Sequence, residues 1–271
     1  MAELPDCAVG VDVGGTTIKA ALVAPATGAL LAPRAMTSTP RPADPSRVLA
    51  EVVGLARALA PVPGTPIGVT LPGVVRNGVV RTAANIDPVW VGFDARSALA
   101  DLVPGSVHVV NDADAAGVAE TAFGAARDQA GVVLVTTLGT GIGSALLLGG
   151  TLLPNTELGH LEIDGRPAEH RAATSALHRE ELGYRAWAER LTTYYRRLEA
   201  LLSPDLIVVG GAVSASAGKF LPHVDIRTPI TAAALGNDAG AIGAALLAAG
   251  RDRTAQPAYW GSVGATHCTS W

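Results

Sequence analysis

Two stretches of the chain show the same order of apolar and polar positions, and both predict a β-hairpin. Residues 8–13 (AVGVDV) and 18–24 (IKAALVA) are apolar runs joined by Gly14-Gly15-Thr16-Thr17. The order returns at 131–148, where VVLVTTL and IGSALLL flank Gly139-Thr140-Gly141. A strand follows each glycine turn, whereas a helix follows a Walker-type loop. We interpret the two stretches as a weak internal duplication: two lobes, each opening with a glycine-tipped hairpin.

Helical spacing of apolar positions predicts helices over residues 45–60, from 112 to about 122, over 184–202, and over 237–249, the last capped by Asn237 or Asp238. One side of the 184–202 helix carries Trp187, Leu191, Tyr194, Leu198 and Leu201. Apolar runs at 67–71, 107–110 and 206–209 predict further strands. Strands that alternate with helices place the chain in the α/β class, and a repeated lobe predicts a ligand cleft between the halves. Residues 251–271 show no periodicity and predict a loose tail.

Composition and charge narrow the function classes. The 271 residues are 49% apolar and long enough for two domains. The two cysteines, Cys7 and Cys268, form neither a disulfide framework nor a metal-ligand cluster. No signal peptide and no apolar run of about 18 residues is found, so we expect a cytoplasmic protein that does not bind membranes. A net charge of −4 argues against nucleic-acid binding, so any phosphate-rich ligand needs a local site.

The glycine turns are candidates for such a site. Glycines let backbone N–H groups approach a phosphate closely, and threonine hydroxyls add donors. A nearby carboxylate such as Asp12 can hold a hydrated Mg²⁺. An ordinary tight turn is the competing interpretation of each motif alone. The three together, with Gly210-Gly211 as the third, indicate a phosphate site; the chain's two lysines, Lys19 and Lys219, both lie beside these motifs.

Two polar groups complete the candidate chemistry. Asn111-Asp112 lies where a strand ends and a helix starts, so Asp112 is either a helix cap or a general base that orients a hydroxyl group and takes its proton. Glu157 and His160, three residues apart, are suited to grip neighbouring sugar hydroxyls. A merely structural His160 is an open alternative. We expect no zinc, because the chain has no cysteine cluster and no HExxH motif.

Taken in the order in which they occur along the chain, these motifs resemble those of the ROK family of sugar kinases across residues 8–249. The matching strings are GVDVGGTTIKAALV, VVNDADAAGVAE, TTLGTGIGSALLLGGTLLPNTELGH and DLIVVGGAVS. The resemblance implies a two-lobed, actin-like (ribonuclease H-like) α/β fold with a central cleft. It further implies a small lobe of residues 1–110 plus 237–250, a large lobe of 111–236 and a flexible tail of 251–271.

The resemblance also implies roles for individual residues. Asp112 corresponds to the catalytic base, and Asp12 to the carboxylate at the metal. The sugar ligands correspond to Asn85, Asn111, Glu157, His160 and Glu169. The donor-phosphate cradle corresponds to Gly14, Gly15, Thr16, Thr17, Lys19, Thr137, Gly139, Thr140 and Gly141, with Gly210 and Gly211 on its far side.

One departure from the family pattern points to a subgroup. Most ROK proteins follow the ExGH segment with a cysteine-rich zinc motif, whereas this chain has LEIDGRPAEHRAATSA, without cysteine. With PNTELGHLEIDG and WAERLTTYYRRLE, the variant is similar to the polyphosphate glucokinases, including polyphosphate/ATP glucomannokinases. This similarity implies transfer of a phosphoryl group from inorganic polyphosphate, or ATP, to the 6-hydroxyl of glucose with Mg²⁺, and a homodimer. Candidates for the basic groove that a polymeric anion needs are Lys19, Lys219, Arg166, Arg171 and Arg179.

Two other functions stay open. An ATP-dependent hexokinase of this family would accept glucose, mannose or an N-acetylated hexosamine through the same motifs. A sugar-responsive transcriptional regulator would carry a DNA-binding module ahead of the sugar domain. Since the first phosphate motif starts at Asp12, we expect no such module here.

Overall fold

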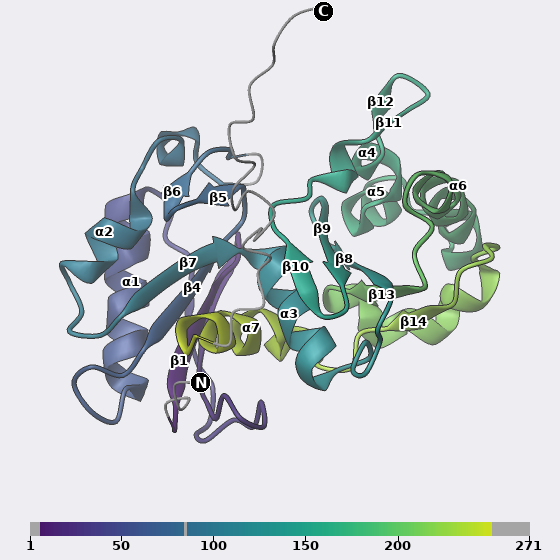
Figure 1. Cartoon of the computed structure of the whole chain (residues 1–271). Helices are drawn as coiled ribbons and strands as arrows, with labels where there is room; N and C mark the ends of the chain where they lie inside the picture. Colours follow the sequence, from purple (N-terminus) through teal and green to yellow (C-terminus); the bar gives the residue numbers. More distant parts are fainter. Residues whose placement is uncertain (1–5, 84–85, 251–271) are drawn as a thin grey trace, which may run out of the picture.

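The computed structural model describes residues 6–83 and 86–250, and its core is two five-stranded sheets with the same strand order (Figure 1). The first sheet has the order β3-β2-β1-β4-β7 and the second the order β10-β9-β8-β13-β14. In each, the first two strands in sequence form an antiparallel hairpin and the later strands run parallel to the first. The sheet topology therefore repeats, as the two glycine-tipped hairpins predict.

The first sheet consists of β1 (Ala8–Val13), β2 (Thr17–Val23), β3 (Ala35–Ser38), β4 (Ile67–Leu71) and β7 (Val107–Asn111). Between β3 and β4, α1 (Pro45–Leu59) begins at Asp44, whose side chain accepts from the Arg47 N–H. A small hairpin of β5 (Val75–Arg76) and β6 (Val79–Val80) precedes α2 (Ala95–Ala100). Alternating apolar residues of the strands and the apolar face of α1 form the core on one side of this sheet.

The second sheet consists of β8 (Val132–Leu138), β9 (Ile142–Leu148), β10 (Thr151–Leu153), β13 (Leu206–Gly210) and β14 (Ile230–Ala232). The hairpin β11 (Glu162–Ile163) and β12 (Arg166–Pro167) and the short helices α4 (Glu169–Ala172) and α5 (Thr174–Arg179) follow β10. The helix α6 (Tyr184–Leu202) then covers one face of the sheet with Trp187, Leu191, Tyr194 and Leu198, all buried. Leu201, which we expected on that face, is 60% exposed.

Two helices lie between the sheets and join them. The helix α3 (Asp112–Phe123) follows the first sheet but packs on β8 and β9, whereas α7 (Ala239–Ala248) follows the second sheet but packs on β1 and β4. The two helices also pack on each other (Figure 1). Strand β1 and helix α7 can lie this close together because Gly10 of β1 has no Cβ, which would clash with the Ala241 backbone of α7. The ends of β1, β7 and α3 therefore meet the β8–β9 hairpin at one cleft.

The lobe boundaries proposed from the sequence stay a prediction. Helix α7 packs against the first sheet, as that proposal requires. The helix is shorter than expected, because it starts at Ala239 after a turn of 3₁₀ helix, and the Asp238 carboxylate bonds to Arg34 at 2.6 Å instead of capping it. The predicted tail of 251–271 lies outside the described residues.

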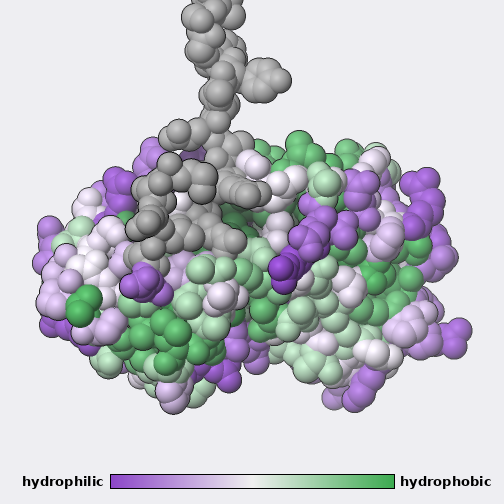
Figure 2. Space-filling model, turned by 60° about the horizontal axis from the view of Figure 1, so that its bottom comes forward, coloured by the Kyte–Doolittle hydropathy of each residue, from purple (hydrophilic) through white to green (hydrophobic). Residues whose placement is uncertain are grey.

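The described residues include no helix long and apolar enough to cross a membrane. Figure 2 shows one face of the molecule, on which apolar residues form patches among hydrophilic ones.

Candidate active site

A cleft of about 240 Å³ lies where the two glycine turns, the start of α3 and the segment after β10 meet. Twelve of the predicted site residues line it: Gly14, Gly15, Asn111, Asp112, Thr137, Gly139, Thr140, Gly141, Glu157, His160, Glu169 and Gly211. Hollows of about 370 and 690 Å³ lie elsewhere and contain none of these residues. The convergence of polar groups, and not cavity size, identifies the cleft as the candidate site.

The start of α3 presents Asp112 to the cleft. Its neighbour Asn111, not Asp112, is the helix cap: the Asn111 Oδ1 accepts from the Asp114 N–H at 3.0 Å, and its Nδ2 donates to the Gly73 carbonyl at 3.1 Å. Among the hydrogen bonds of residues 6–83 and 86–250, the Asp112 carboxylate accepts one, from the adjacent Ala113 N–H at 2.9 Å. The capping alternative for Asp112 is therefore wrong, and one face of its carboxylate is available to a ligand. Both ends of the Asn111 amide are already occupied by protein groups.

The cleft makes Asp112 a proton acceptor near neutral pH. Burial, with a further contribution from the nearby Asp12 carboxylate, raises the pKa of Asp112 from 3.8 to about 7. A general base works best when its pKa lies near the working pH. The side chain can therefore take up a proton from a bound hydroxyl group at neutral pH.

Asp12 lies on β1 beside the first turn. Its Oδ1 accepts from the Thr70 hydroxyl at 2.8 Å, and a Cβ on Gly240, in the first turn of α7, would lie only 2.8 Å from its carboxylate. Burial raises the pKa of Asp12, while the Thr70 hydrogen bond and the charge of Lys19 lower it. Lys19 faces Asp12 across the β1–β2 pair. Asp12 itself does not line the cleft, but its charge acts on Asp112, which does. A divalent cation near the two carboxylates would relieve their repulsion.

Hydrogen bonds from neighbouring segments fix both glycine turns. In the first turn, the Gly14 N–H donates to the Thr17 carbonyl at 3.0 Å and the Thr39 hydroxyl donates to the Gly14 carbonyl at 2.6 Å. In the second, the Ser175 N–H and hydroxyl donate to the Gly139 and Thr140 carbonyls at 3.0 and 2.6 Å. Protein donors therefore hold the Gly14, Gly139 and Thr140 carbonyls, which are not available to a ligand.

Gly211 supports the second turn from behind. Its backbone has a φ of +85°, and a Cβ there would clash with the Leu138 main chain. Only glycine combines this left-handed backbone with such close approach. Gly139, at the tip of the turn, differs: none of the described atoms lies within 4 Å of the position that its Cβ would occupy. Gly139 lines the cleft, and the space beside it is open.

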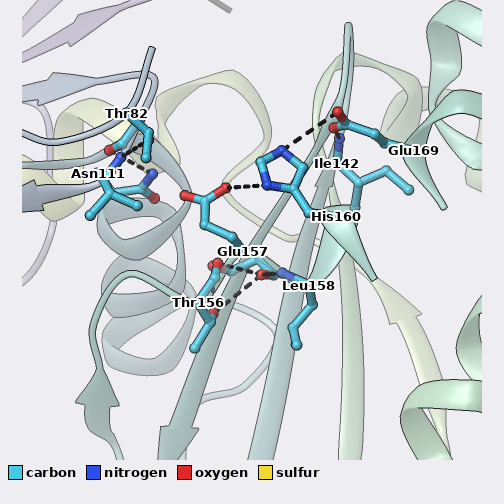
Figure 3. A network of polar contacts seen from close by, with 11 residues as sticks. Thr82, Asn111, Ile142, Thr156, Glu157, Leu158, His160 and Glu169 are labelled. Atoms are coloured by element: carbon cyan, nitrogen blue, oxygen red, sulfur yellow. Dashed lines mark hydrogen bonds and ion pairs between the residues drawn. The ribbon is translucent and has the colours of Figure 1, made fainter. Parts of the chain in front are cut away.

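Figure 3 shows a polar chain on the other side of the cleft, running from Glu157 through His160 to Glu169. The His160 Nδ1 lies 4.0 Å from Glu157 Oε2, and its Nε2 lies 3.6 Å from Glu169 Oε1. The other Glu169 oxygen accepts from the Ile142 N–H at 3.0 Å, which ties this chain to the second glycine turn. Burial raises the pKa of Glu157, and the charge of His160 lowers it.

The segment that carries Glu157 is held against β9 by Ser144. The Ser144 hydroxyl donates to the Thr156 carbonyl at 2.6 Å and accepts from the Leu158 N–H at 3.0 Å. Glu157 makes no capping bond to the following 3₁₀ turn, Leu158–His160. Its carboxylate points into the space between the Asn111 and His160 side chains, where it can accept hydrogen bonds from a polyol.

Four predicted phosphate ligands do not line the cleft: Thr16, Thr17, Lys19 and Gly210. Thr16 and Thr17 supply main-chain carbonyls that close the first turn, Lys19 lies beside Asp12, and Gly210 is buried at the end of β13. Asn85 lies outside the described residues. Three of the candidate groove cations, Arg166, Arg171 and Arg179, line the same 690 Å³ hollow, which is separate from the cleft. Another candidate, Lys219, lies over the Tyr184 ring.

Sequence reasoning missed several residues that line the cleft, among them Pro72, Gly73, Thr82 and Ala212. In the sequence, the dipeptide Pro72-Gly73 indicates only a turn. The available signal was its position, since it directly follows β4, whose parallel neighbour β7 ends at Asn111. The carboxyl ends of parallel strands share one edge of a sheet, so the segment after β4 had to lie near Asp112.

Among the described residues, no cluster of three or more His, Cys, Asp or Glu side chains has the geometry of a metal site. The carboxylates that line the cleft, Asp112, Glu157 and Glu169, therefore do not form a metal cage. A Mg²⁺ ion is commonly held by one or two carboxylates together with substrate phosphates.

Comparison with known proteins agrees with this geometry. The chain is 46% identical to the polyphosphate glucokinase of Mycobacterium tuberculosis over 241 residues, which are 88% of this chain and 89% of that protein. The Mycobacterium leprae polyphosphate glucokinase is 45% identical over 88% of this chain and 73% of its own length. The crystal structure of the inorganic polyphosphate/ATP-glucomannokinase from Arthrobacter sp. strain KM superposes with a TM-score of 0.88 at 44% identity, covering 91% of this chain and all of that one.

A more distant solved structure has the same fold. A ROK family glucokinase from Streptomyces griseus, in complex with glucose and AMPPNP, is 25% identical with a TM-score of 0.76, over 89% of this chain and 98% of that one. The model of the ROK family matches residues 8–176, which include both glycine turns, Asp112 and the Glu157–Glu169 segment. From the repeated sheets, the shared cleft and these matches together, we conclude that this chain is a member of the ROK family with the two-lobed actin-like fold.

Proposed function

We propose that the chain is a polyphosphate glucokinase, which transfers the terminal phosphoryl group of inorganic polyphosphate to the 6-hydroxyl of glucose. The observation that carries the proposal is the cleft itself: a carboxylate with a pKa near 7 lies between a polar chain suited to a sugar and two rigid glycine turns suited to phosphates. The similarity to the two mycobacterial enzymes over 88% of the chain supports this donor and acceptor.

In this account, each group in the cleft has one task. Glu157, His160 and Glu169 hold the hydroxyls of glucose, and Asp112 accepts the proton of the 6-hydroxyl. The oxygen then attacks the terminal phosphorus, a new O–P bond forms, and the bridging P–O bond breaks to release polyphosphate shorter by one unit. Because the transition state is loose, the N–H groups of the turns contribute mainly by positioning and charge stabilisation.

Magnesium fits the carboxylate end of the cleft. Asp12 would hold it, close to Asp112, at the point where the two carboxylates repel each other. A bound Mg²⁺ neutralises charge on the donor phosphates. The protein contributes the fixed orientation of Asp12 through the Thr70 hydrogen bond.

A donor comparison tests the proposal. Purified protein with glucose and Mg²⁺ is expected to form glucose 6-phosphate with long-chain polyphosphate at a kcat/KM at least equal to that with ATP. The measurement is a coupled assay of glucose 6-phosphate, with EDTA as the control that removes the metal. Glucose 6-phosphate formed from ATP alone would replace the proposal with an ATP-dependent hexokinase, and no product from either donor would refute both.

The Arthrobacter structure gives a reason to include a second acceptor and a second donor in that assay. Its name describes a glucomannokinase that uses polyphosphate or ATP, and it is 44% identical to this chain. We therefore propose mannose as an alternative acceptor and ATP as an alternative donor. The homodimer that the family resemblance implies is likewise part of the proposal.

A further inference from the structure

Asn155 joins the two lobes at the edge of the cleft. It lies in the segment after β10, in the lobe of the second sheet, and its side chain bonds to Val75 in the β5–β6 hairpin of the first lobe. The Val75 N–H donates to Asn155 Oδ1 at 2.8 Å, and Asn155 Nδ2 donates to the Val75 carbonyl at 3.0 Å. One amide side chain thus pairs with both backbone groups of Val75, as a neighbouring strand would.

The backbone of Asn155 makes a second connection, to α3. Its N–H donates to Asp114 Oδ2 at 2.7 Å, and Asp114 is almost fully buried in the first turn of α3, two residues after Asp112. Asp114 in turn donates its own N–H to Asn111 Oδ1, and Asn111 Nδ2 donates to the Gly73 carbonyl, two residues before Val75. Together with the main chain from Gly73 to Val75, these hydrogen bonds close a ring of Val75, Asn155, Asp114, Asn111 and Gly73.

This ring borders the cleft: Asn111 and Gly73 line it, whereas Asn155, Asp114 and Val75 do not. Asp112 lies between two members of the ring, Asn111 and Asp114, and Glu157 lies two residues after a third, Asn155. Gly73 belongs to the wall of the cleft, whereas Val75 is buried in the core of the first lobe. Asn155 makes no contact with either glycine turn among the hydrogen bonds of the described residues. The ring fixes the sugar side of the cleft relative to Asp112 and leaves the donor side to other bonds.

We propose that Asn155 is a positioning residue, which sets the spacing between Asp112 and Glu157 by tying the β5–β6 hairpin of one lobe to the start of α3 and to the sugar-binding segment of the other. The predicted effects on kinetics rest on the proposed function. Loss of the Asn155 side chain should weaken the binding of glucose and leave the binding of the phosphate donor unchanged.

The backbone of Asn155 decides how to test this. Its φ is 61°, in the left-handed region, where glycine is unstrained but alanine is not. Asn155→Gly therefore removes the amide without adding backbone strain. Asn77→Gly is the matched control, because Asn77 has a φ of 54° in the turn of the same β5–β6 hairpin and does not line the cleft.

The experiment measures steady-state kinetics for both substrates and hydrogen exchange of the Val75 amide. For Asn155→Gly we expect the KM for glucose to rise about tenfold or more, since misplacement by about 1 Å can cost up to 10²-fold. The KM for the donor should stay within about threefold, and the Val75 amide should lose its protection. Asn77→Gly should match the wild type in all three.

Two results would overturn the assignment. One is an unchanged KM for glucose together with unchanged protection of the Val75 amide. The other is a parallel rise in both KM values with a lower melting temperature, which would mark Asn155 as merely structural. If the wild-type protein phosphorylates no sugar, the proposed function fails, and the exchange rate of Val75 still decides whether Asn155 ties the lobes together.

Discussion

Asp112→Asn is expected to lower kcat for glucose phosphorylation by about 10³-fold, within the range of 10²- to 10⁴-fold that general-base catalysis supplies. Asparagine keeps the shape of the side chain but cannot take the proton of the attacking hydroxyl. The glucose dissociation constant should change by less than about threefold, because Glu157, His160 and Glu169 keep their contacts. Rapid-quench kinetics and isothermal titration of glucose measure the two quantities separately.

The pH profile and the stability of the same variant are linked to the pKa of Asp112. The base must be deprotonated, so wild-type kcat/KM should fall about tenfold per pH unit below about 7 and level off above it. The variant should lack this inflection.

The same pKa shift predicts the effect of the variant on stability. Because burial disfavours the Asp112 carboxylate in the folded state, the charge of Asp112 destabilises the fold progressively as the pH rises from the unfolded pKa of 3.8 towards 7. At pH 8, Asp112→Asn should therefore melt a few degrees higher than the wild type. A variant that keeps more than a tenth of the wild-type kcat would show that Asp112 is not the base.

Gly139→Ala should raise the KM for polyphosphate about tenfold or more and leave the melting temperature unchanged. The new methyl group meets no described atom within 4 Å, so the fold accommodates it, but it occupies the space where a phosphate would approach the turn. Gly211→Ala is the informative comparison. Its Cβ would clash with the Leu138 main chain from a left-handed backbone, so it should lower the melting temperature and the activity together.

The comparison of Gly139→Ala with Gly211→Ala distinguishes an effect on polyphosphate binding from an effect on the stability of the fold. Initial rates over a range of polyphosphate concentrations, with thermal melting of each variant, provide the measurements. If Gly139→Ala binds polyphosphate as tightly as the wild type, the second glycine turn is not a phosphate cradle, and the similarity of the two hairpins reflects folding alone.

The parts of the fold that could be predicted are those with local signals. Apolar runs ending in glycine identified β1, β2, β8 and β9, and helical spacing located α1 and α6 to within one residue at each end. The strands β3, β10 and β14, of three or four residues and only partly buried, carry too short a pattern to be found. Leu201 matches the helical period but lies beyond the edge of the core.

Site residues that belong to a local sequence motif could be predicted, whereas those defined by contacts between distant segments could not. Asp112 and His160 belong to local strings, and the structure brings them to one cleft. The capping role of Asn111 was missed because two adjacent polar residues at a helix start compete for it, and only the backbone geometry decides. Asn155 could not be found at all, because its partner Val75 is 80 residues away.

The central claim is that Asp112 and the two glycine turns face the same bound pair of substrates. A crystal structure of Asp112→Asn with glucose, Mg²⁺ and tripolyphosphate tests it most directly. We predict that the glucose O6 lies within about 3.2 Å of the residue 112 side chain, with the terminal phosphate between Gly14-Gly15 and Gly139-Thr140. A glucose bound with O6 directed away from residue 112, or a tripolyphosphate that contacts neither turn, would contradict the account.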